Sequence, residues 1–285
     1  MPPCGRTSCT LSGRDIERLL RARGMPVRAG RRLAAFQPAP SLPPTATQPV
    51  LVRAADPPAA ADEHQDDDEH QHEPRSTEGT EGTEGSGLEL TAMQFGLRST
   101  GPEGRGGGAL LLNARAEQLD RREQWSAAVV QGRRCVVVCD AFFERQRATD
   151  TSYRLAPPPD AASPLLLLAG LHFPQHEARS DGNGASESDG EGVSSSVVIV
   201  TTEPGAFGAV HHRMPLVLPD AAAVRCWLDT PVHGVAAPLA RVLPVLTRRL
   251  AAGDLCAQPE PPRAAAAPPP RKRVCRTRPI DSFFT

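Results

Sequence analysis

Residues 133–144 read RRCVVVCDAFFE, and this stretch decides the fold more than any other part of the chain. Cys135 to Cys139 form a continuous apolar run of strand length, which is typical of a strand buried on both faces of a sheet. The run is followed by Asp140 and, after two phenylalanines, by Glu144. Polar groups that follow a buried strand lie at the edge of a sheet, where functional sites tend to occur.

Other segments around this stretch alternate between strand and helix signals. Further strands are expected at 49–53, 88–95, 109–113, 165–171 and 197–201. A first helix is expected to begin after Ser12, which can cap it together with Asp15, and to end at Gly24. Later helices are expected at 114–123, 220–228 and 238–250. This pattern predicts an α+β fold with a β core and flanking helices.

The composition of the 285 residues indicates that part of the chain is not packed. Hydrophobic residues make up 39% and aromatic residues only 4%, while 24 Gly and 30 Pro are present. The net charge of -1 hides a strong separation, because acids gather at 54–87 and 175–195 and arginines elsewhere. We interpret these two acidic stretches as disordered insertions in a domain of residues 1–256, and 257–285 as a disordered tail.

Several classes of protein are excluded or disfavoured. No apolar run approaches the ~18 residues that a membrane helix needs, so no membrane partner is expected. The seven cysteines form no Cys-x-x-Cys pair, which favours reduced thiols inside a cell. Cysteine and histidine lack the short paired spacing of zinc ligands, so neither a metal nor another cofactor is expected.

Four short segments carry reactive or polar groups in a fixed order: CGR at 4–6, NARAE at 113–117, RRCVVVCDAFFE at 133–144 and HHRMP at 211–215. Taken singly, they have ordinary alternatives, which are a surface thiol, a turn residue, a solvated charge and loop histidines. Taken in order, they resemble the SOS-response-associated peptidase (SRAP) family of abasic-site processing proteins. The resemblance covers about 4–53 and 88–256.

The resemblance implies a β-barrel core and a specific reaction. In this family an N-terminal cysteine forms a thiazolidine crosslink with the aldehyde of an abasic site in single-stranded DNA, and a thiol autopeptidase activity exposes that cysteine. The implied catalytic residues are Cys4, Asn113, Glu144 and His211. The implied DNA-binding residues are Arg6, Phe95, Arg115, Arg145 and Arg213. Phe95 and Arg145 each stand where the family has tryptophan.

The beginning of the chain departs from the family pattern, because Met1, Pro2 and Pro3 precede Cys4. Three interpretations stay open: the chain cleaves itself before Cys4, translation starts elsewhere, or the crosslinking chemistry is lost. Without a free α-amine on Cys4, no thiazolidine can form.

The C-terminal tail carries a second motif. Ile280, Phe283 and Phe284 match the spacing of the sliding-clamp (PCNA) interaction motif QxxIxxFF, with Thr277 in place of Gln. The basic residues 271–273 suit nuclear import, although a plain basic linker is the alternative. We therefore expect a nuclear monomer that the clamp recruits.

Two functions remain as hypotheses. The first is a DNA damage sensor that links covalently to abasic sites at replication forks. The second is a non-catalytic module that binds single-stranded or modified DNA and is recruited by the clamp. A plain protease is a third interpretation, for which the sequence offers no substrate-pocket motif.

Overall fold

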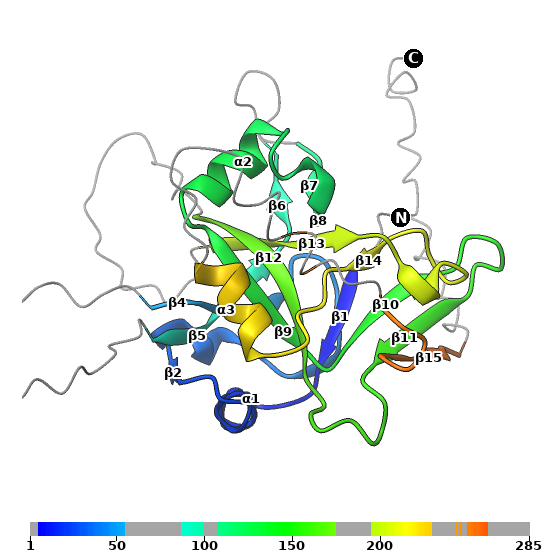
Figure 1. The fold of residues 1–285 in the computed structure, drawn as a ribbon, viewed down its shortest axis with the longest axis horizontal. Coiled ribbons are helices and arrows are strands. Elements are labelled where there is room, and N and C mark those ends of the chain that lie inside the picture. Colours follow the sequence, from blue (N-terminus) through cyan, green and yellow to red (C-terminus); the bar gives the residue numbers. More distant parts are fainter. Residues whose placement is uncertain are drawn as a thin grey trace, which may run out of the picture.

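The computed structural model of the chain describes residues 5–54, 87–99, 108–174, 195–229, 243, 246 and 250–261. These residues form two main β-sheets, a two-stranded ribbon and helices packed around them (Figure 1). The mixed α+β class predicted from the sequence is therefore confirmed. Nearly all of the two acidic insertions, the tail beyond residue 261 and Cys4 lie outside the described residues.

The larger sheet surrounds the strand that the sequence marks most strongly. Its order is β14-β13-β12-β9-β4-β5-β2, and β8 pairs with β13 beside this path. An additional parallel pairing joins β13 to β5. Closure into the barrel that the resemblance implies stays a prediction. The bounds are β2 (Val27–Ala29), β4 (Thr47–Arg53), β5 (Leu88–Phe95), β8 (Asn113–Arg115), β9 (Arg134–Cys139), β12 (Leu166–Pro174), β13 (Ser195–Thr202) and β14 (Met214–Pro215).

Both faces of this sheet are buried, each in its own apolar cluster. Val136 and Val138 of β9 pack in one cluster, and Cys135, Val137 and Cys139 pack in the other. Successive side chains of a strand point to opposite faces, so one continuous apolar strand supplies both clusters. The expectation of a doubly buried strand at 135–139 is confirmed.

The smaller sheet is antiparallel and has the order β15-β11-β10-β1-β3. Its bounds are β1 (Arg6–Cys9), β3 (Ala39–Leu42), β10 (Ala141–Arg145), β11 (Ser152–Ala156) and β15 (Cys256–Pro259). The chain crosses from the larger to the smaller sheet at Asp140, between β9 and β10. The carboxylate of Asp140 accepts hydrogen bonds from the backbone N–H and hydroxyl of Thr10 at 2.7 and 2.6 Å. These bonds fix the corner that leads to Glu144.

Two of the predicted helices are confirmed. Ser12 caps the first helix by accepting the N–H of Asp15 at 3.2 Å, and Trp227 anchors the helix expected at 220–228 by donating to the carbonyl of Cys135 at 2.9 Å. No helix in the described part of the chain is long and apolar enough to cross a membrane. The helical elements are α1 (Gly13–Ala22), η1 (Arg31–Ala35), η3 (Ala116–Gln118), α2 (Glu123–Val130), η4 (Gly205–Phe207) and α3 (Ala221–Asp229).

The helix predicted at 114–123 is wrong. Asn113, Ala114 and Arg115 form β8, which pairs in parallel with β13, and α2 begins only at Glu123. A local helical preference is weak, and pairing with a buried strand overrides it. The strand expected at 109–113 is divided between β8 and the ribbon of β6 (Leu97–Arg98) with β7 (Leu110–Leu111). Most of the helix expected at 238–250 lies outside the described residues.

The boundary expected at residue 256 is also wrong. Residues 256–259 form β15, which pairs with β11 along its whole length. Pro259 is tolerated because β15 is an edge strand of the sheet. The folded part of the chain therefore includes the first residues of the segment that the composition assigns to a tail.

Candidate active site

The chain enters the smaller sheet beside Glu144. β1 and β10 run antiparallel with Arg6 opposite Phe143, so the chain reaches β1 at the end of β10 that carries Glu144. The Glu144 side chain is only 1% exposed, which rules out a solvated charge at a strand end. Cys4, the predicted nucleophile, lies outside the described residues.

His211 faces Glu144 from the loop between β13 and β14. Its Nδ1 lies 3.7 Å from Oε2 of Glu144, and its side chain is 4% exposed. The same nitrogen lies 3.1 Å from the carbonyl oxygen of Arg213 and 3.2 Å from its backbone nitrogen. The structure thus brings two of the predicted catalytic residues together. A buried carboxylate beside an imidazole is a suitable pair for general acid–base chemistry.

The environment keeps the imidazole of His211 neutral. Burial lowers the pKa of His211, the backbone hydrogen bond with Arg213 opposes this shift, and the positive charge of Arg147 lowers the pKa further. The net shift is downward from the ordinary value of 6.5. At neutral pH His211 therefore contacts Glu144 as an uncharged ring that can accept a proton.

Asn113 lies on β8 rather than in a turn. It is partly buried and pairs with Ile199 of β13. β13 then leads through η4 to the loop that carries His211. Asn113 is thus placed by the same strand that positions the histidine loop, while the catalytic role that the resemblance implies for it stays a prediction.

Arg213 is held inside the protein by Glu117. Its Nη1 and Nη2 donate to the two carboxylate oxygens of Glu117 at 2.7 and 2.9 Å, and Nη2 also donates to the carbonyl of Thr201 at 2.7 Å. Burial acts to raise the pKa of Glu117, but the hydrogen bonds and charge of Arg213 lower it overall. This bidentate pair joins η3 to the histidine loop and neutralises the arginine that the sequence assigns to DNA.

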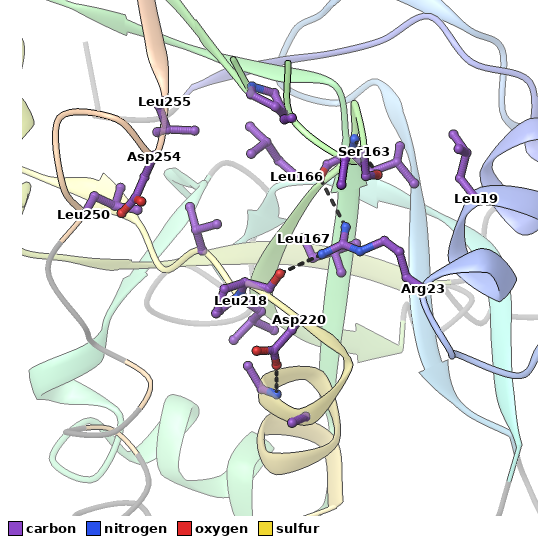
Figure 2. Close-up of a pocket in the computed structure, with 18 of the residues that line it drawn as sticks. Leu19, Arg23, Ser163, Leu166, Leu167, Leu218, Asp220, Leu250, Asp254 and Leu255 are labelled. Carbon is purple, nitrogen blue, oxygen red and sulfur yellow. Dashed lines mark hydrogen bonds between the residues drawn. The ribbon is translucent and has the colours of Figure 1, made fainter. Parts of the chain in front are cut away.

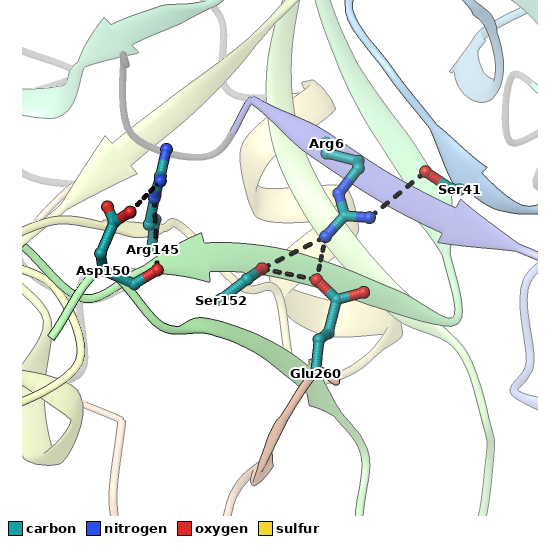
Figure 3. A network of polar contacts seen from close by, with 6 residues as sticks. All are labelled: Arg6, Ser41, Arg145, Asp150, Ser152 and Glu260. Atoms are coloured by element: carbon teal, nitrogen blue, oxygen red, sulfur yellow. Dashed lines mark hydrogen bonds and ion pairs between the residues drawn. The ribbon is translucent and has the colours of Figure 1, made fainter. Parts of the chain in front are cut away.

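Arg6 is also engaged by an acid, in the network shown in Figure 3. Its Nη2 forms an ion pair with Glu260 and donates to the hydroxyl of Ser152 at 3.2 Å, while Nη1 donates to Ser41 at 3.4 Å. Its guanidinium carbon lies 3.7 Å from the centre of the Phe143 ring. We call Arg6, Ser41, Ser152 and Glu260 the Arg6 network. The network spans β1, because Ser41 lies on β3 on one side and Ser152 and Glu260 lie on β11 and after β15 on the other.

Arg145 forms a local ion pair across the turn between β10 and β11. Its guanidinium contacts the carboxylate of Asp150, and Nε donates to the backbone carbonyl of the same residue at 3.4 Å (Figure 3). Arg145 is exposed, but its charge is partly compensated. It stands where the resemblance leads one to expect a stacking tryptophan.

Phe95 does not form part of a binding surface. Its side chain is fully buried, with 0% exposed, and packs in the cluster that contains Val197 and Phe207. The prediction that Phe95 offers a ring to DNA is therefore wrong. An aromatic residue in an apolar strand is equally suited to the core, and the sequence pattern does not distinguish the two cases.

Arg115 differs from the other predicted DNA-binding arginines. It is exposed at the end of β8, opposite Thr201 of β13. Within the described residues it makes no ion pair, in contrast to Arg6, Arg145 and Arg213.

The buried thiols of the described part are unsuited to nucleophilic chemistry. Burial and the negative charge of Asp140 raise the pKa of Cys9 to about 12. Burial also raises the pKa of Cys135 and Cys139 well above the ordinary value. A thiol needs its thiolate form to attack, so these three side chains act as apolar core residues. The described residues also include no group of three His, Cys, Asp or Glu side chains that could hold a metal ion.

A cavity of about 890 Å³ lies away from these residues, between α1, α3 and the segment before β12 (Figure 2). Its lining is largely apolar and includes Leu19, Leu166 and Leu218. Arg23 crosses one side and donates to the carbonyls of Leu165 and Pro219 at 3.3 and 2.8 Å. Neither Glu144, His211 nor any predicted DNA-binding arginine lines it.

The acids that pair with the predicted arginines carry little or no signal in the sequence. Glu117 lies in the quoted NARAE segment, but its partner Arg213 lies 96 residues away, so no local spacing reveals this pair. Asp150 lies in a polar turn and Glu260 in a proline-rich segment, where nothing in the local sequence points to an arginine partner.

Comparison with known proteins adds a family and relatives. The sequence model of the SOS response associated peptidase (SRAP) family matches residues 3–251. The abasic site processing protein HMCES of Xenopus tropicalis is 26% identical over 253 residues, covering 79% of this chain and 66% of the frog protein. The mouse protein of the same name is 27% identical over 144 residues, covering 41% and 37% of the two chains. The chain spans less than two thirds of either relative.

Two crystal structures of proteins from Bordetella bronchiseptica share the fold. The first has a TM-score of 0.56 and 16% identity, and the match covers 90% of this chain and all of that one. The second, a phage-related protein, has a TM-score of 0.52 and 21% identity, with 90% and 94% of the two chains covered. At these identities the likeness concerns the fold alone.

Proposed function

The chain belongs to the SOS response associated peptidase family, and from that premise we propose that it processes abasic sites in single-stranded DNA. The curated relatives are named abasic site processing proteins, which supports this substrate. The observation that carries the proposal is the buried Glu144–His211 pair, which lies where the chain enters β1. An acid–base pair beside a reactive chain start suits chemistry on an aldehyde.

The proposed reaction links Cys4 to the ring-opened sugar. The α-amine of Cys4 attacks the aldehyde carbon, water leaves, and an imine forms. The thiol sulfur then bonds to the imine carbon while the nitrogen takes up the proton, which closes a thiazolidine ring. Amine and thiol on one residue make the second step intramolecular, and proximity accelerates such steps strongly. No metal or other cofactor takes part.

The Glu144–His211 pair would move the protons of this reaction. A carboxylate and a neutral imidazole can remove a proton from the attacking amine and return one to the departing water. Burial holds both groups in place and excludes bulk water. His211 would also act on the opened sugar, and Asn113 would orient the amine.

The amine must first be free. Met1, Pro2 and Pro3 precede Cys4, so we propose cleavage before Cys4 by the chain's own thiol autopeptidase activity. Intact mass spectrometry of the purified protein tests this step, since loss of the three residues is expected. A mature protein that retains Pro2 or Pro3 would contradict the crosslinking reaction.

A denaturing gel tests the covalent link. The protein is incubated with a single-stranded oligonucleotide that contains an abasic site, and a band of protein–DNA product is expected. Cys4→Ala should abolish the band, while Cys226→Ala, a thiol on α3, should leave it. Binding without a covalent band would favour a non-catalytic DNA-binding module instead.

The tail would bring the protein to replication forks. We expect Ile280, Phe283 and Phe284 to bind the sliding clamp and residues 271–273 to direct a monomeric protein to the nucleus. Capture of purified clamp by the full chain, and its loss in Phe283→Ala/Phe284→Ala, tests the interaction. Equal capture by both proteins would reject it.

A further inference from the structure

In the part of the chain that the structure describes, two arginines beside the histidine pair lack the acidic partners that the other site arginines have. The rings of His211 and His212 lie close together, with their centres 4.3 Å apart. Arg115 and Arg147 influence this pair by charge, and neither makes an ion pair within the described residues. We call His211, His212, Arg115 and Arg147 the histidine face.

Arg147 reaches the histidine face because its turn is attached to the histidine loop. Gln146, the preceding residue, donates from its side chain to the carbonyl of Ala209 at 2.6 Å. The same residue donates its backbone N–H to the carbonyl of Thr151 at 2.8 Å, which closes the turn between β10 and β11. Arg147 itself is exposed. The turn thus presents a solvated guanidinium next to the loop that carries His211.

Arg115 reaches the same loop from the larger sheet. It pairs with Thr201 on β13, and the carbonyl of Thr201 accepts a hydrogen bond from Arg213, which follows the two histidines. The nearby Glu117 does not cancel Arg115, because both of its carboxylate oxygens bind Arg213. Arg115 and Arg147 therefore flank the histidines from two different strand systems.

We propose that Arg147 is a further DNA-binding residue and that it and Arg115 together hold a phosphate of the single strand at the histidine face. This inference rests on the proposed function. An exposed guanidinium without a carboxylate partner keeps its charge and its paired N–H donors for an incoming anion. Arg6, Arg145 and Arg213 would have to give up an existing acid before they could do the same.

The arginine charges of this face also act on His212. Burial lowers the pKa of His212, and the charges of His211, Arg147, Arg213 and Arg115 lower it further. Added positive charge is thus unfavourable there, and an added anion is correspondingly favourable.

The salt dependence of binding tests the proposal. Affinity of the full chain for an undamaged oligothymidylate is measured over a series of salt concentrations. Each phosphate contact on single-stranded DNA contributes about 0.7 to the slope of log affinity against log salt. Arg147→Gln and Arg115→Gln should each reduce the slope by about that amount, while Arg147→Lys should retain it.

A matched control is Arg225→Gln, which removes the same charge from an exposed position of α3. Its slope should equal that of the wild type. An unchanged slope in Arg147→Gln, or an equal loss in Arg225→Gln, would overturn the proposal. The undamaged strand carries no aldehyde, so failure of the crosslinking reaction is measured separately and leaves this result unaffected.

Discussion

The Arg6 network and the histidine face both contain arginine close to the Glu144–His211 pair. An acid compensates the charge of Arg6, whereas the described residues place no acid against Arg115 or Arg147. Arg6 is clamped by Glu260 and two serines and packs on the Phe143 ring. Arg115 and Arg147 have no such partner within the described residues. The sequence motifs do not reveal this difference, because they contain arginine in both places and do not indicate its partner.

The arginines of one site thus fall into two kinds, those bound by an acid and those exposed to solvent. A guanidinium that is bound by a carboxylate joins strands, as Arg6 joins β1 to the residue after β15 and Arg213 joins the histidine loop to η3. A solvated guanidinium can bind a phosphate at little cost in free energy, because no existing ion pair has to be broken. Substitutions in the two regions test this division.

The largest effect is expected from the buried acid at the centre of the site. Glu144→Gln removes a proton acceptor and should slow formation of the covalent DNA product by about 10²- to 10⁴-fold, the range for a general acid or base. Glu260→Gln, the matched change in the Arg6 network, should leave the rate nearly unchanged. Single-turnover kinetics on a denaturing gel measure both. Equal losses in the two variants would contradict the separation of roles.

The free energy of unfolding should fall more when Arg213 is replaced than when Arg115 is replaced. Arg213→Met leaves the carbonyl of Thr201 and the carboxylate of Glu117 without their donor and should cost about 1–3 kcal/mol of unfolding free energy. Arg115→Gln breaks no ion pair among the described residues and should change stability by less than about 0.5 kcal/mol. Urea unfolding followed by fluorescence gives both values. A large loss in Arg115→Gln would show that this side chain is structural.

Removal of the acid from the Arg6 network should make Arg6 resemble Arg115. In Glu260→Gln the guanidinium is no longer neutralised, so affinity for undamaged single-stranded DNA should rise several-fold at low salt. Asp15→Asn, which removes an acid from an exposed pair with Arg18 on α1, should change affinity far less. If both substitutions raise affinity equally, the effect is one of net charge and not of Arg6.

The smallest effect concerns the protonation of His211. Its pKa lies below 6.5 in the folded protein, so the neutral form contributes stability that is complete above pH 6.5 and is lost as the pH falls through the folded value. Arg147→Gln removes a charge that lowers this pKa, so the pKa of His211 should rise by roughly a few tenths of a pH unit. Titration of the imidazole resonance by NMR measures the midpoint, with His211→Gln to assign it. A downward shift in Arg147→Gln would contradict the stated sign.

The doubly buried strand was predictable because its residues leave few alternatives. Five consecutive apolar side chains from Cys135 to Cys139 must be covered on both faces, and the sheet supplies two clusters for them. The Ser12 cap was predictable for a similar reason, since its partner Asp15 lies three residues away. Local chemistry determines both features.

The errors occur where distant partners decide. Ala114 and Arg115 are the first residues of the helix expected at 114–123 but pair with β13, which lies more than 80 residues away along the chain. Phe95 reads as a surface ring from its motif and is buried by the packing of strands on the larger sheet. The proximity of Glu144 and His211 was implied by a resemblance and by no spacing in the sequence, because 67 residues separate them. The acid that neutralises Arg6 was missed for the same reason, because Glu260 lies 254 residues away along the chain.

β15, the last strand, ends close to the point where β1 begins. β15 lies three strands from β1 in the smaller sheet, and neighbouring strands are about 4.8 Å apart, so the two lie within roughly 15 Å of each other. Chain that continues beyond residue 261 therefore starts close to the point where β1 begins. If the tail binds the sliding clamp as proposed, the clamp would be held at a high local concentration near the start of β1, and this concentration would fall as the connection lengthens. A change in the length of the connection after residue 261 would then change delivery to DNA without altering any residue of the site.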